Sequence, residues 1–235
     1  MTVFRLTREL IFPPSHCADP DGLLAVGGDL SPERLLLAYR QGIFPWYSAN
    51  TAILWWSPDP RLVLFPHELR VSKSLERVLR KKVFTVTMDR AFTEVIRHCA
   101  AARRRAGDGT WIVPDMMVAY HRLHQIGYAH SAEAWHQGKL VGGLYGVALG
   151  RVFFGESMFT EKTDASKVAL VHLVQLLRQW EFKLIDCQVT TAHLKRFGAR
   201  EIARKEFLKR LDGVSGEPDR RGSWSGFLET LPELQ

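Results

Sequence analysis

Asp186 and Gln188 stand two positions apart at the end of an apolar run whose composition is typical of a buried β-strand. Side chains at positions i and i+2 of a strand project from the same face. We therefore expect Asp186 and Gln188 to lie side by side, with Cys187 facing the other way. A carboxylate and an amide together near the end of an apolar strand are candidates for a binding or catalytic site. The alternative is a structural pair that ties down an adjacent loop.

Glu156 is a second candidate for chemistry, because it directly follows a predicted strand and Gly155. The residues around it are large and apolar: Phe153, Phe154, Met158 and Phe159. A carboxylate in such surroundings must find a partner or shift its pKa, unless it is simply exposed at the end of the strand. Polar groups at the ends of neighbouring strands, with apolar side chains around them, indicate a binding or catalytic site.

The cysteines do not predict a metal centre or a disulfide framework. Cys17, Cys99 and Cys187 are an odd number, are widely spaced and form no C-x-x-C motif. We expect Cys187 to be a buried structural thiol rather than a nucleophile, because strand alternation turns it away from Asp186 and Gln188. No metal and no cofactor are expected.

The charge balance favours an anionic partner. The chain of 235 residues has a formal net charge of +7 and a pI of about 9.5, which is typical of proteins that bind nucleic acid. One face of a predicted helix gathers basic side chains, which are either a contact surface for phosphates or an ordinary solvated face: Lys73, Arg77, Arg80 and Lys81. Trp46 and Trp111 are candidates for stacking on a base, whereas Trp55 and Trp56 resemble core residues.

The elements that must position these groups fall into two parts, residues 1–62 and 63–235. The first part is rich in Pro, Gly and Trp and predicts short strands and one helix over 32–41. Ser31 is a suitable N-cap for that helix, Pro32 fits its first position and Gly42 its end. We expect a small N-terminal α+β domain.

The second part alternates helices and strands. Helices are expected over 72–82, 91–104, 114–125, 164–180, 191–197 and 204–211. Strands are expected over 84–88, 183–188 and 200–203. Residues 129–159 should form three further strands, with turns at 137–138 and 150. A basic loop is expected over 103–108. This order predicts an α/β layer architecture with a mixed sheet, compatible with the acyltransferase fold of N-acetyltransferases. No apolar run is long enough for a membrane span and no signal peptide is present, so a cytoplasmic monomer is the expectation.

Seven ordered motifs resemble one bacterial family, the leucyl/phenylalanyl-tRNA–protein transferases, over about residues 3–210. They are GLLAVGGDLSPERLLLAYRQGIFPWY, ILWWSPDPR, GTWIVPDM, LVGGLYGV, GESMF, DASKVAL and LIDCQV. The resemblance implies a small N-terminal domain and a larger acetyltransferase-like domain. It implies transfer of leucine or phenylalanine, with methionine as an alternative, from aminoacyl-tRNA to proteins that begin with Arg or Lys. The product would carry a degradation signal of the N-degron pathway.

The resemblance also implies roles for individual residues. Asp186 and Gln188 would serve the attack of the amine on the ester, and Glu156 would hold the α-amino group of the aminoacyl ester. The aminoacyl side chain would occupy a pocket lined by Leu144, Phe153, Met158, Leu173, Leu177 and Ile185. The 3′-terminal adenosine would lie against Trp46, Trp111 and Ser166. The acceptor stem would contact Lys73, Arg77, Arg80 and Lys81. Leu144 and Leu173 stand where Met and Phe are expected in the best-known relatives, so the sequence leaves the pocket shape and the preference among Leu, Phe and Met open.

Other functions remain open at this point. A CoA-dependent N-acetyltransferase would require a glycine-containing loop that opens a helix and cradles pyrophosphate, whereas Gly142 and Gly143 fall inside a strand pattern. A non-enzymatic RNA-binding protein would need the basic helix and the tryptophans but not Glu156, Asp186 and Gln188. A transferase that builds peptide bridges of the cell wall shares the chemistry but fits the chain length less well.

Overall fold

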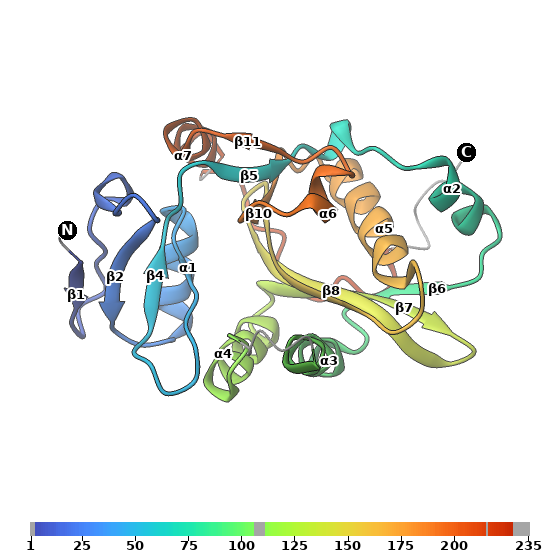
Figure 1. Cartoon of the computed structure of the whole chain (residues 1–235), viewed down its shortest axis with the longest axis horizontal. Helices are drawn as coiled ribbons and strands as arrows, with labels where there is room; N and C mark the ends of the chain where they lie inside the picture. Colours follow the sequence, from blue (N-terminus) through green and yellow to red (C-terminus); the bar gives the residue numbers. More distant parts are fainter. Residues whose placement is uncertain (1–2, 106–110, 215, 228–235) are drawn as a thin grey trace.

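The chain folds into two β-sheets with helices packed around them (Figure 1). The computed structural model of the chain describes residues 3–105, 111–214 and 216–227. Within these residues the small sheet has four strands in the order β1 (Phe4–Leu6), β2 (Leu23–Gly27), β4 (Leu54–Trp56) and β3 (Phe44–Pro45). The large sheet has seven, in the order β11 (Arg200–Ile202), β5 (Arg61–Leu64), β10 (Leu184–Gln188), β9 (Val152–Thr160), β8 (Lys139–Leu149), β7 (Ala129–His136) and β6 (Thr85–Met88).

Seven α-helices occur among the described residues. They are α1 (Pro32–Arg40), α2 (Lys73–Arg80), α3 (Phe92–Arg105), α4 (Pro114–Gln125), α5 (Ala165–Gln179), α6 (Ala192–Lys195) and α7 (Arg204–Asp212), with short 3-10 turns at Ser15–Cys17 and Pro66–Glu68. Helices α3 and α4 pack on one face, and α5 packs on the other (Figure 1). The mixed α/β architecture predicted from the sequence is confirmed.

Local sequence signals account for the ends of several elements. The Ser31 hydroxyl accepts a hydrogen bond from the backbone N–H of Arg34 and caps α1, and Pro32 occupies the first turn. Gly42 follows α1 with φ of +70°, and a Cβ there would come within 2.9 Å of the Phe207 ring. Ser72 caps α2 in the same way. The predicted strands and helices are all present, while the predicted basic loop at 103–108 largely falls outside the described residues or within the end of α3.

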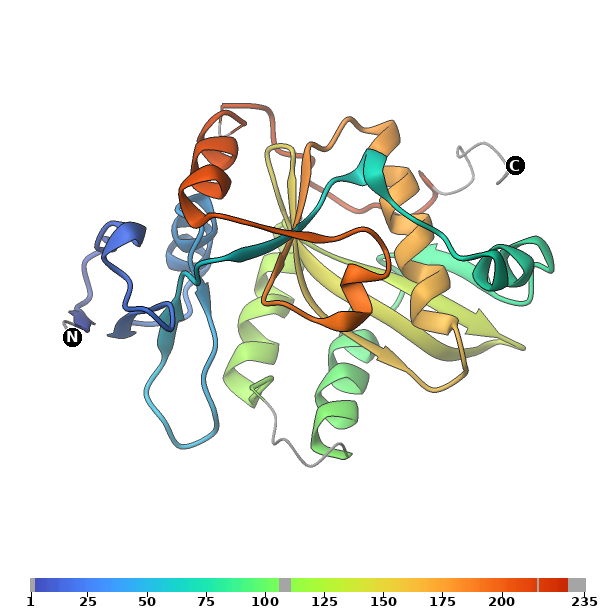
Figure 2. The same ribbon diagram turned by 45° about the horizontal axis from the view of Figure 1, so that its top comes forward.

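Residues 57–60 lead from β4 of the small sheet into β5 of the large sheet, and the start of α7 lies beside this crossing (Figure 2), where Arg204 bonds to Ser57 and Asp59. The Arg61 guanidinium, at the start of β5, lies between two aromatic rings at this junction. Its central carbon is 4.8 Å from the centroid of the Phe44 ring and 4.7 Å from that of Phe207. Arginine stacks well on aromatic faces, so one side chain connects the small sheet, the large sheet and α7.

Strands β9 and β10 are the parallel neighbours at the middle of the large sheet. They pair only from Val152 to Phe154 and from Leu184 to Asp186, and then they separate. Both strands also carry an irregularity just after the paired residues, one against β8 and one against β5. The candidate functional residues lie where these two strands part.

Candidate functional site

Two β-bulges place Glu156 and Gln188. In β9, Ser157 pairs with Tyr145 and Gly155 pairs with Gly146, which leaves Glu156 as the extra residue. In β10, Asp186 pairs with Val63 and Gln188 with Leu62. Cys187 is therefore the extra residue of β10. A bulge inserts one residue into a ladder and redirects the side chains beside it, so each bulge sets the direction of one polar side chain.

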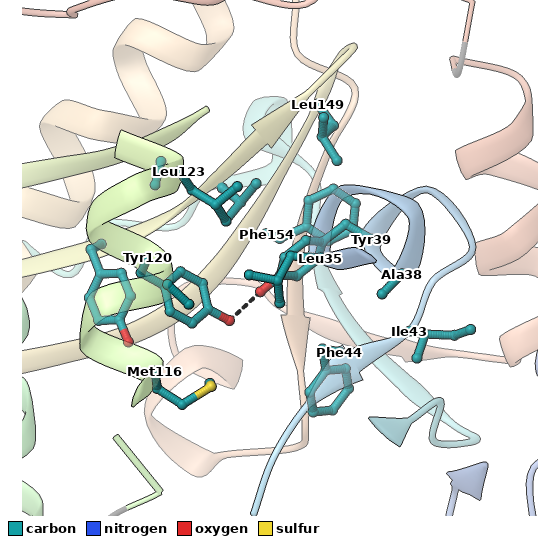
Figure 3. Packing of buried hydrophobic residues seen from close by; sticks show 14 of the residues in the cluster. Leu35, Ala38, Tyr39, Ile43, Phe44, Met116, Tyr120, Leu123, Leu149 and Phe154 are labelled. Atoms are coloured by element: carbon teal, nitrogen blue, oxygen red, sulfur yellow. Dashed lines mark hydrogen bonds between the residues drawn. The ribbon is translucent and has the colours of Figure 1, made fainter. Parts of the chain in front are cut away.

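Glu156 is buried and accepts three hydrogen bonds. The Tyr39 hydroxyl donates to Oε1 at 2.7 Å, the Tyr120 hydroxyl donates to Oε2 at 2.8 Å, and Nε2 of Gln188 donates to Oε1 at 2.8 Å. The two tyrosine hydroxyls also hydrogen-bond to each other, and they point toward one another from α1 and α4 (Figure 3). The carboxylate thus joins four elements: α1, α4, β9 and β10.

Burial raises the pKa of Glu156 to about 7, because an ionised carboxylate loses its hydration there. The bonds from Tyr39, Tyr120 and Gln188 act in the opposite direction, and the negative charge of Asp186 adds to the upward shift. A carboxyl group whose pKa lies near neutrality exchanges its proton readily at physiological pH. Such groups are typical of functional sites.

Asp186 has a different partner from the one expected. Its two carboxylate oxygens accept from Nε and Nη2 of Arg61 at 2.8 and 2.6 Å, and both side chains are almost fully buried, with 1% of Arg61 and 0% of Asp186 exposed. Oδ1 of Asp186 also accepts from the backbone N–H of Gln188 at 2.9 Å. Asp186 therefore contacts the backbone of Gln188, and not its side-chain amide.

The expectation of regular alternation in this strand is wrong. Cys187 and Gln188 both line the cavity described below, although they are consecutive, and Asp186 does not line it. The physical reason is the bulge, together with a φ of +62° at Gln188, a left-handed conformation that is uncommon for a residue with a side chain. The bond from Asp186 to the Gln188 N–H stabilises this conformation, which is the kind of backbone strain often found at functional sites.

A cavity of about 460 Å³ opens beside Glu156 and Gln188. Its walls are mostly apolar, and five residues predicted for the aminoacyl pocket are among them: Leu144, Phe153, Met158, Leu173 and Ile185. Leu170 and Leu64 extend the same apolar wall. Glu156 and Gln188 supply polar groups at its edge, together with Ser157, Thr191 and His193. This combination of apolar walls and a few convergent polar groups is typical of a ligand site.

Two predicted members lie outside the cavity wall. Leu177 is fully buried in the apolar cluster under α5. The Ser166 hydroxyl instead accepts a hydrogen bond from the Thr160 hydroxyl at 2.7 Å. Neither side chain lines the cavity.

Trp46 and Trp111 both line the cavity, although they come from different parts of the chain. Trp46 is 41% exposed, and Trp56 supports it with an indole N–H that donates to the Trp46 carbonyl oxygen at 2.6 Å. Trp55 is fully buried in the small sheet, as expected for a core residue. An exposed indole beside a cavity is available to stack on a planar ligand.

The predicted basic face is on α2 and is exposed, with Lys73, Arg77, Arg80 and Lys81 all in contact with solvent. Helix α2 lies at the end of the large sheet that is remote from the small sheet (Figure 1). The basic face is separate from the cavity, because no residue of α2 lines it.

Cys187, which was expected to be a buried structural thiol, is partly buried. Burial raises the pKa of Cys187 far above its usual range, so the thiolate is not formed at neutral pH, although the side chain lines the cavity. Among the described residues no cluster of His, Cys, Asp and Glu could hold a metal ion. Within the same ranges, no helix is long and apolar enough to cross a membrane.

Sequence reasoning did not identify Tyr39, Tyr120 and Arg61 as site residues. The two tyrosines reach Glu156 from sequence separations of 117 and 36 residues. Arg61 lies 125 residues from Asp186. These residues carry hydroxyl or guanidinium groups within largely apolar stretches of sequence. Such groups require hydrogen-bond partners when they are buried, and this was the one feature that could have identified them.

Comparisons with known proteins identify the family. The sequence model described as leucyl/phenylalanyl-tRNA protein transferase matches residues 63–212, and that of its N-terminal domain matches residues 28–59. A leucyl/phenylalanyl-tRNA–protein transferase from Syntrophobacter fumaroxidans is 71% identical over 226 residues, covering 96% of this chain and 97% of the relative. One from an Anaeromyxobacter species is 61% identical over 224 residues, covering 95% of each.

A solved structure with a similar overall arrangement is that of L-PGS from Bacillus licheniformis. It has a TM-score of 0.40 and 12% identity, and the match covers 72% of this chain and 54% of that one. This likeness is too weak to bear on function. The family models and the full-length relatives are decisive, and they show that this chain belongs to the leucyl/phenylalanyl-tRNA–protein transferase family and is an aminoacyltransferase.

Proposed function

We propose that the enzyme transfers leucine or phenylalanine, with methionine as an alternative, from aminoacyl-tRNA to the N-terminal α-amino group of proteins that begin with Arg or Lys. The relatives named above support the donor and the protein acceptor. The observation that carries the proposal is the buried Glu156 carboxylate at the edge of a mostly apolar cavity of about 460 Å³. That arrangement suits an apolar aminoacyl group whose α-nitrogen is cationic.

The donor side chain would occupy the apolar part of the cavity. Phe153, Met158 and Ile185 provide walls without hydrogen-bonding groups, so charged or strongly polar side chains would lose their hydration there without compensation. The α-ammonium group of the ester would lie against Glu156. Tyr39 and Tyr120 donate to this carboxylate and favour its ionised form, in which it attracts a cation.

The transfer itself is aminolysis of an ester. The neutral α-amine of the acceptor attacks the ester carbonyl carbon and forms a C–N bond, the C–O bond to the tRNA ribose breaks, and the amine loses a proton while the ribose oxygen gains one. Since Nε2 of Gln188 donates to Glu156, its carbonyl oxygen Oε1 remains to accept from the attacking amine. Fixing that amine near the carbonyl lowers the entropic part of the barrier.

Asp186 is proposed to act through Gln188. Its contact with the Gln188 N–H holds the left-handed turn that directs the amide side chain toward Glu156. The bidentate pair with Arg61 in turn fixes the Asp186 carboxylate. Asp186 is therefore a positioning residue for the amide, and its negative charge also favours the positive charge that develops on the attacking nitrogen.

The tRNA would be held at two places. Trp46 and Trp111 would stack on the 3′-terminal adenine at the cavity mouth, and the basic face of α2 would contact acceptor-stem phosphates. Phosphate contacts give affinity without a sequence code, which suits recognition of several tRNAs. We further propose a boundary between the two domains at residues 62 and 63, a cytoplasmic location, a monomeric enzyme and a role in N-degron formation.

The test is transfer of labelled leucine from leucyl-tRNA to a peptide that begins with Arg, with an otherwise identical peptide that begins with Asp as the control. No CoA is added. Transfer to the Arg peptide alone supports the proposal. Equal transfer to both peptides contradicts the acceptor assignment. Binding of charged and uncharged tRNA with equal affinity and no transfer favours a non-enzymatic RNA-binding protein.

A further inference from the structure

Most described residues after α7 are exposed, but one large side chain of this segment is buried. Trp224 is only 1% exposed, although it lies beyond residue 212, where the match to the catalytic-domain family model ends. It belongs to the apolar cluster that also contains Phe153, Leu173 and Ile185, which line the cavity. The indole of Trp224, which comes from a Gly- and Ser-rich stretch, thus packs behind residues that line the cavity.

Asp89 holds Trp224 in two ways: it bonds directly to the Trp224 backbone, and it bonds to His130, whose ring stacks on the indole. Its Oδ2 accepts from the Trp224 backbone N–H at 2.7 Å and from Nδ1 of His130 at 2.9 Å. The His130 ring stacks on the indole with centroids 3.6 Å apart and planes 7° from parallel. The indole N–H donates to the carbonyl oxygen of Arg220 at 3.0 Å. The indole is therefore fixed in both position and orientation.

Phe153 lies between this indole and the cavity. It lines the cavity, and its ring centroid is 6.1 Å from that of Trp224, which does not itself line the cavity. Gly146 also packs closely on Phe153, because a Cβ at Gly146 would come within 2.6 Å of its ring. Protein interiors are close-packed, so the position of a wall residue depends on what stands behind it.

We propose that Trp224 is a specificity-determining positioning residue that holds Phe153 in place and so sets the depth of the aminoacyl pocket. This inference rests on the proposed function, in which the cavity receives the donor side chain. A smaller residue at 224 leaves space behind Phe153, and the ring can move away from the cavity. The pocket then deepens, which favours larger donor side chains over leucine.

The experiment compares Trp224→Leu and Trp224→Phe with the wild type. Donors are tRNAs charged with leucine, phenylalanine or 2-naphthylalanine, and the acceptor is one Arg peptide at a temperature where every variant is folded. We expect the ratio of kcat/KM for phenylalanine over leucine to rise at least about fivefold in Trp224→Leu, with a gain for naphthylalanine. Trp224→Phe, which keeps an aromatic ring, should show a smaller shift.

Phe227→Ala is the local control, because the Phe227 ring packs on Trp180 with centroids 5.1 Å apart and Phe227 does not line the cavity. It should leave the donor ratio unchanged. A purely structural role of Trp224 would lower transfer from all donors alike, and an unchanged ratio in both Trp224 variants overturns the inference. If Trp224→Leu does not fold, the ratio measured with Trp224→Phe decides.

A double-mutant cycle separates this route from a general loosening of the fold. Phe153→Leu should shift the donor ratio on its own, and the shift should be smaller in the Trp224→Leu background because both changes act through the same ring. Additive shifts contradict the coupling. Failure of the wild type to transfer either amino acid would instead contradict the proposed function, so the two failures are distinct.

Discussion

The Tyr39 hydroxyl, on a helix of the N-terminal part, donates a 2.7 Å hydrogen bond to Oε1 of Glu156 in a bulge of the large sheet. Tyr120 donates to the other oxygen of the same carboxylate. The N-terminal part therefore contributes directly to the polar centre of the site, in addition to the Trp46 side chain that it places at the cavity. A change in how α1 packs would alter the charge state of Glu156.

Tyr39→Phe should move the pH dependence of transfer upward. Tyr39 stabilises the ionised form of Glu156, so its loss raises the pKa of that carboxyl further above about 7. A hydrogen bond to a charged group is worth enough to shift the rising limb of kcat/KM by about 1 pH unit. The measurement is kcat/KM from pH 5.5 to 9, corrected for spontaneous ester hydrolysis. Tyr47→Phe is the control, and an unshifted limb in Tyr39→Phe contradicts the role of Tyr39.

Glu156→Gln should remove one contribution to the pH dependence of stability. The pKa of Glu156 is about 7 in the folded state and near 4.5 otherwise. Between these values the folded chain keeps a proton that the unfolded chain loses, so the free energy of unfolding falls as pH rises from about 4.5 to 7, by up to about 3 kcal/mol from this group. Urea unfolding at pH 5 and 8 measures it.

Glu133 provides the matched control for that experiment. Burial also raises the pKa of Glu133 to about 7, but the Ser131 and Thr87 hydroxyls bond to it and it does not line the cavity. Glu133→Gln should change the pH dependence of stability in the same direction while the pH profile of transfer stays as in the wild type. Glu156→Gln should lower transfer by about a hundredfold, because the cationic α-nitrogen loses its partner. Near-normal transfer by Glu156→Gln would contradict the assignment.

The Arg61–Asp186 pair predicts a separation of stability from activity. Asp186→Ala or Arg61→Ala alone leaves a buried charge without its partner and should cost about 3–5 kcal/mol of unfolding free energy. Arg61→Met combined with Asp186→Leu removes both charges and should recover much of that loss. Transfer should stay low in the double variant, because the acceptor for the Gln188 N–H is gone. A stable and fully active double variant would make the pair purely structural.

Arg77→Ala combined with Arg80→Ala should weaken tRNA binding and reduce its dependence on salt. Each phosphate contact that is lost lowers the slope of log K against log salt by roughly 0.7–0.9, so the double variant should lose about 1–2 units of slope. Titration of tRNA binding between 50 and 300 mM salt, roughly the range in which phosphate contacts are screened, measures this effect. Arg178→Ala, an exposed arginine on α5, is the control. An unchanged slope places the tRNA on another surface.

The sequence by itself determined the elements and the identity of the central polar groups. Ser31, Pro32 and Gly42 define α1 through capping and backbone preferences that act within a few residues, and the alternation of residues 129–159 predicts the three strands that are observed. The types and order of the motif residues also pointed to Glu156 and Gln188, both of which line the cavity.

Only the tertiary structure decided how these groups are oriented. Strand alternation predicted a shared face for Asp186 and Gln188, but a bulge and a left-handed φ direct their side chains to Arg61 and Glu156 instead. A bulge depends on the register with neighbouring strands, which no local pattern contains. The hydrogen bonds from Tyr39 and Tyr120 to Glu156 join residues that are far apart in the chain, and so does the packing of Trp224 behind Phe153. Close packing brings these residues together only after the layers assemble.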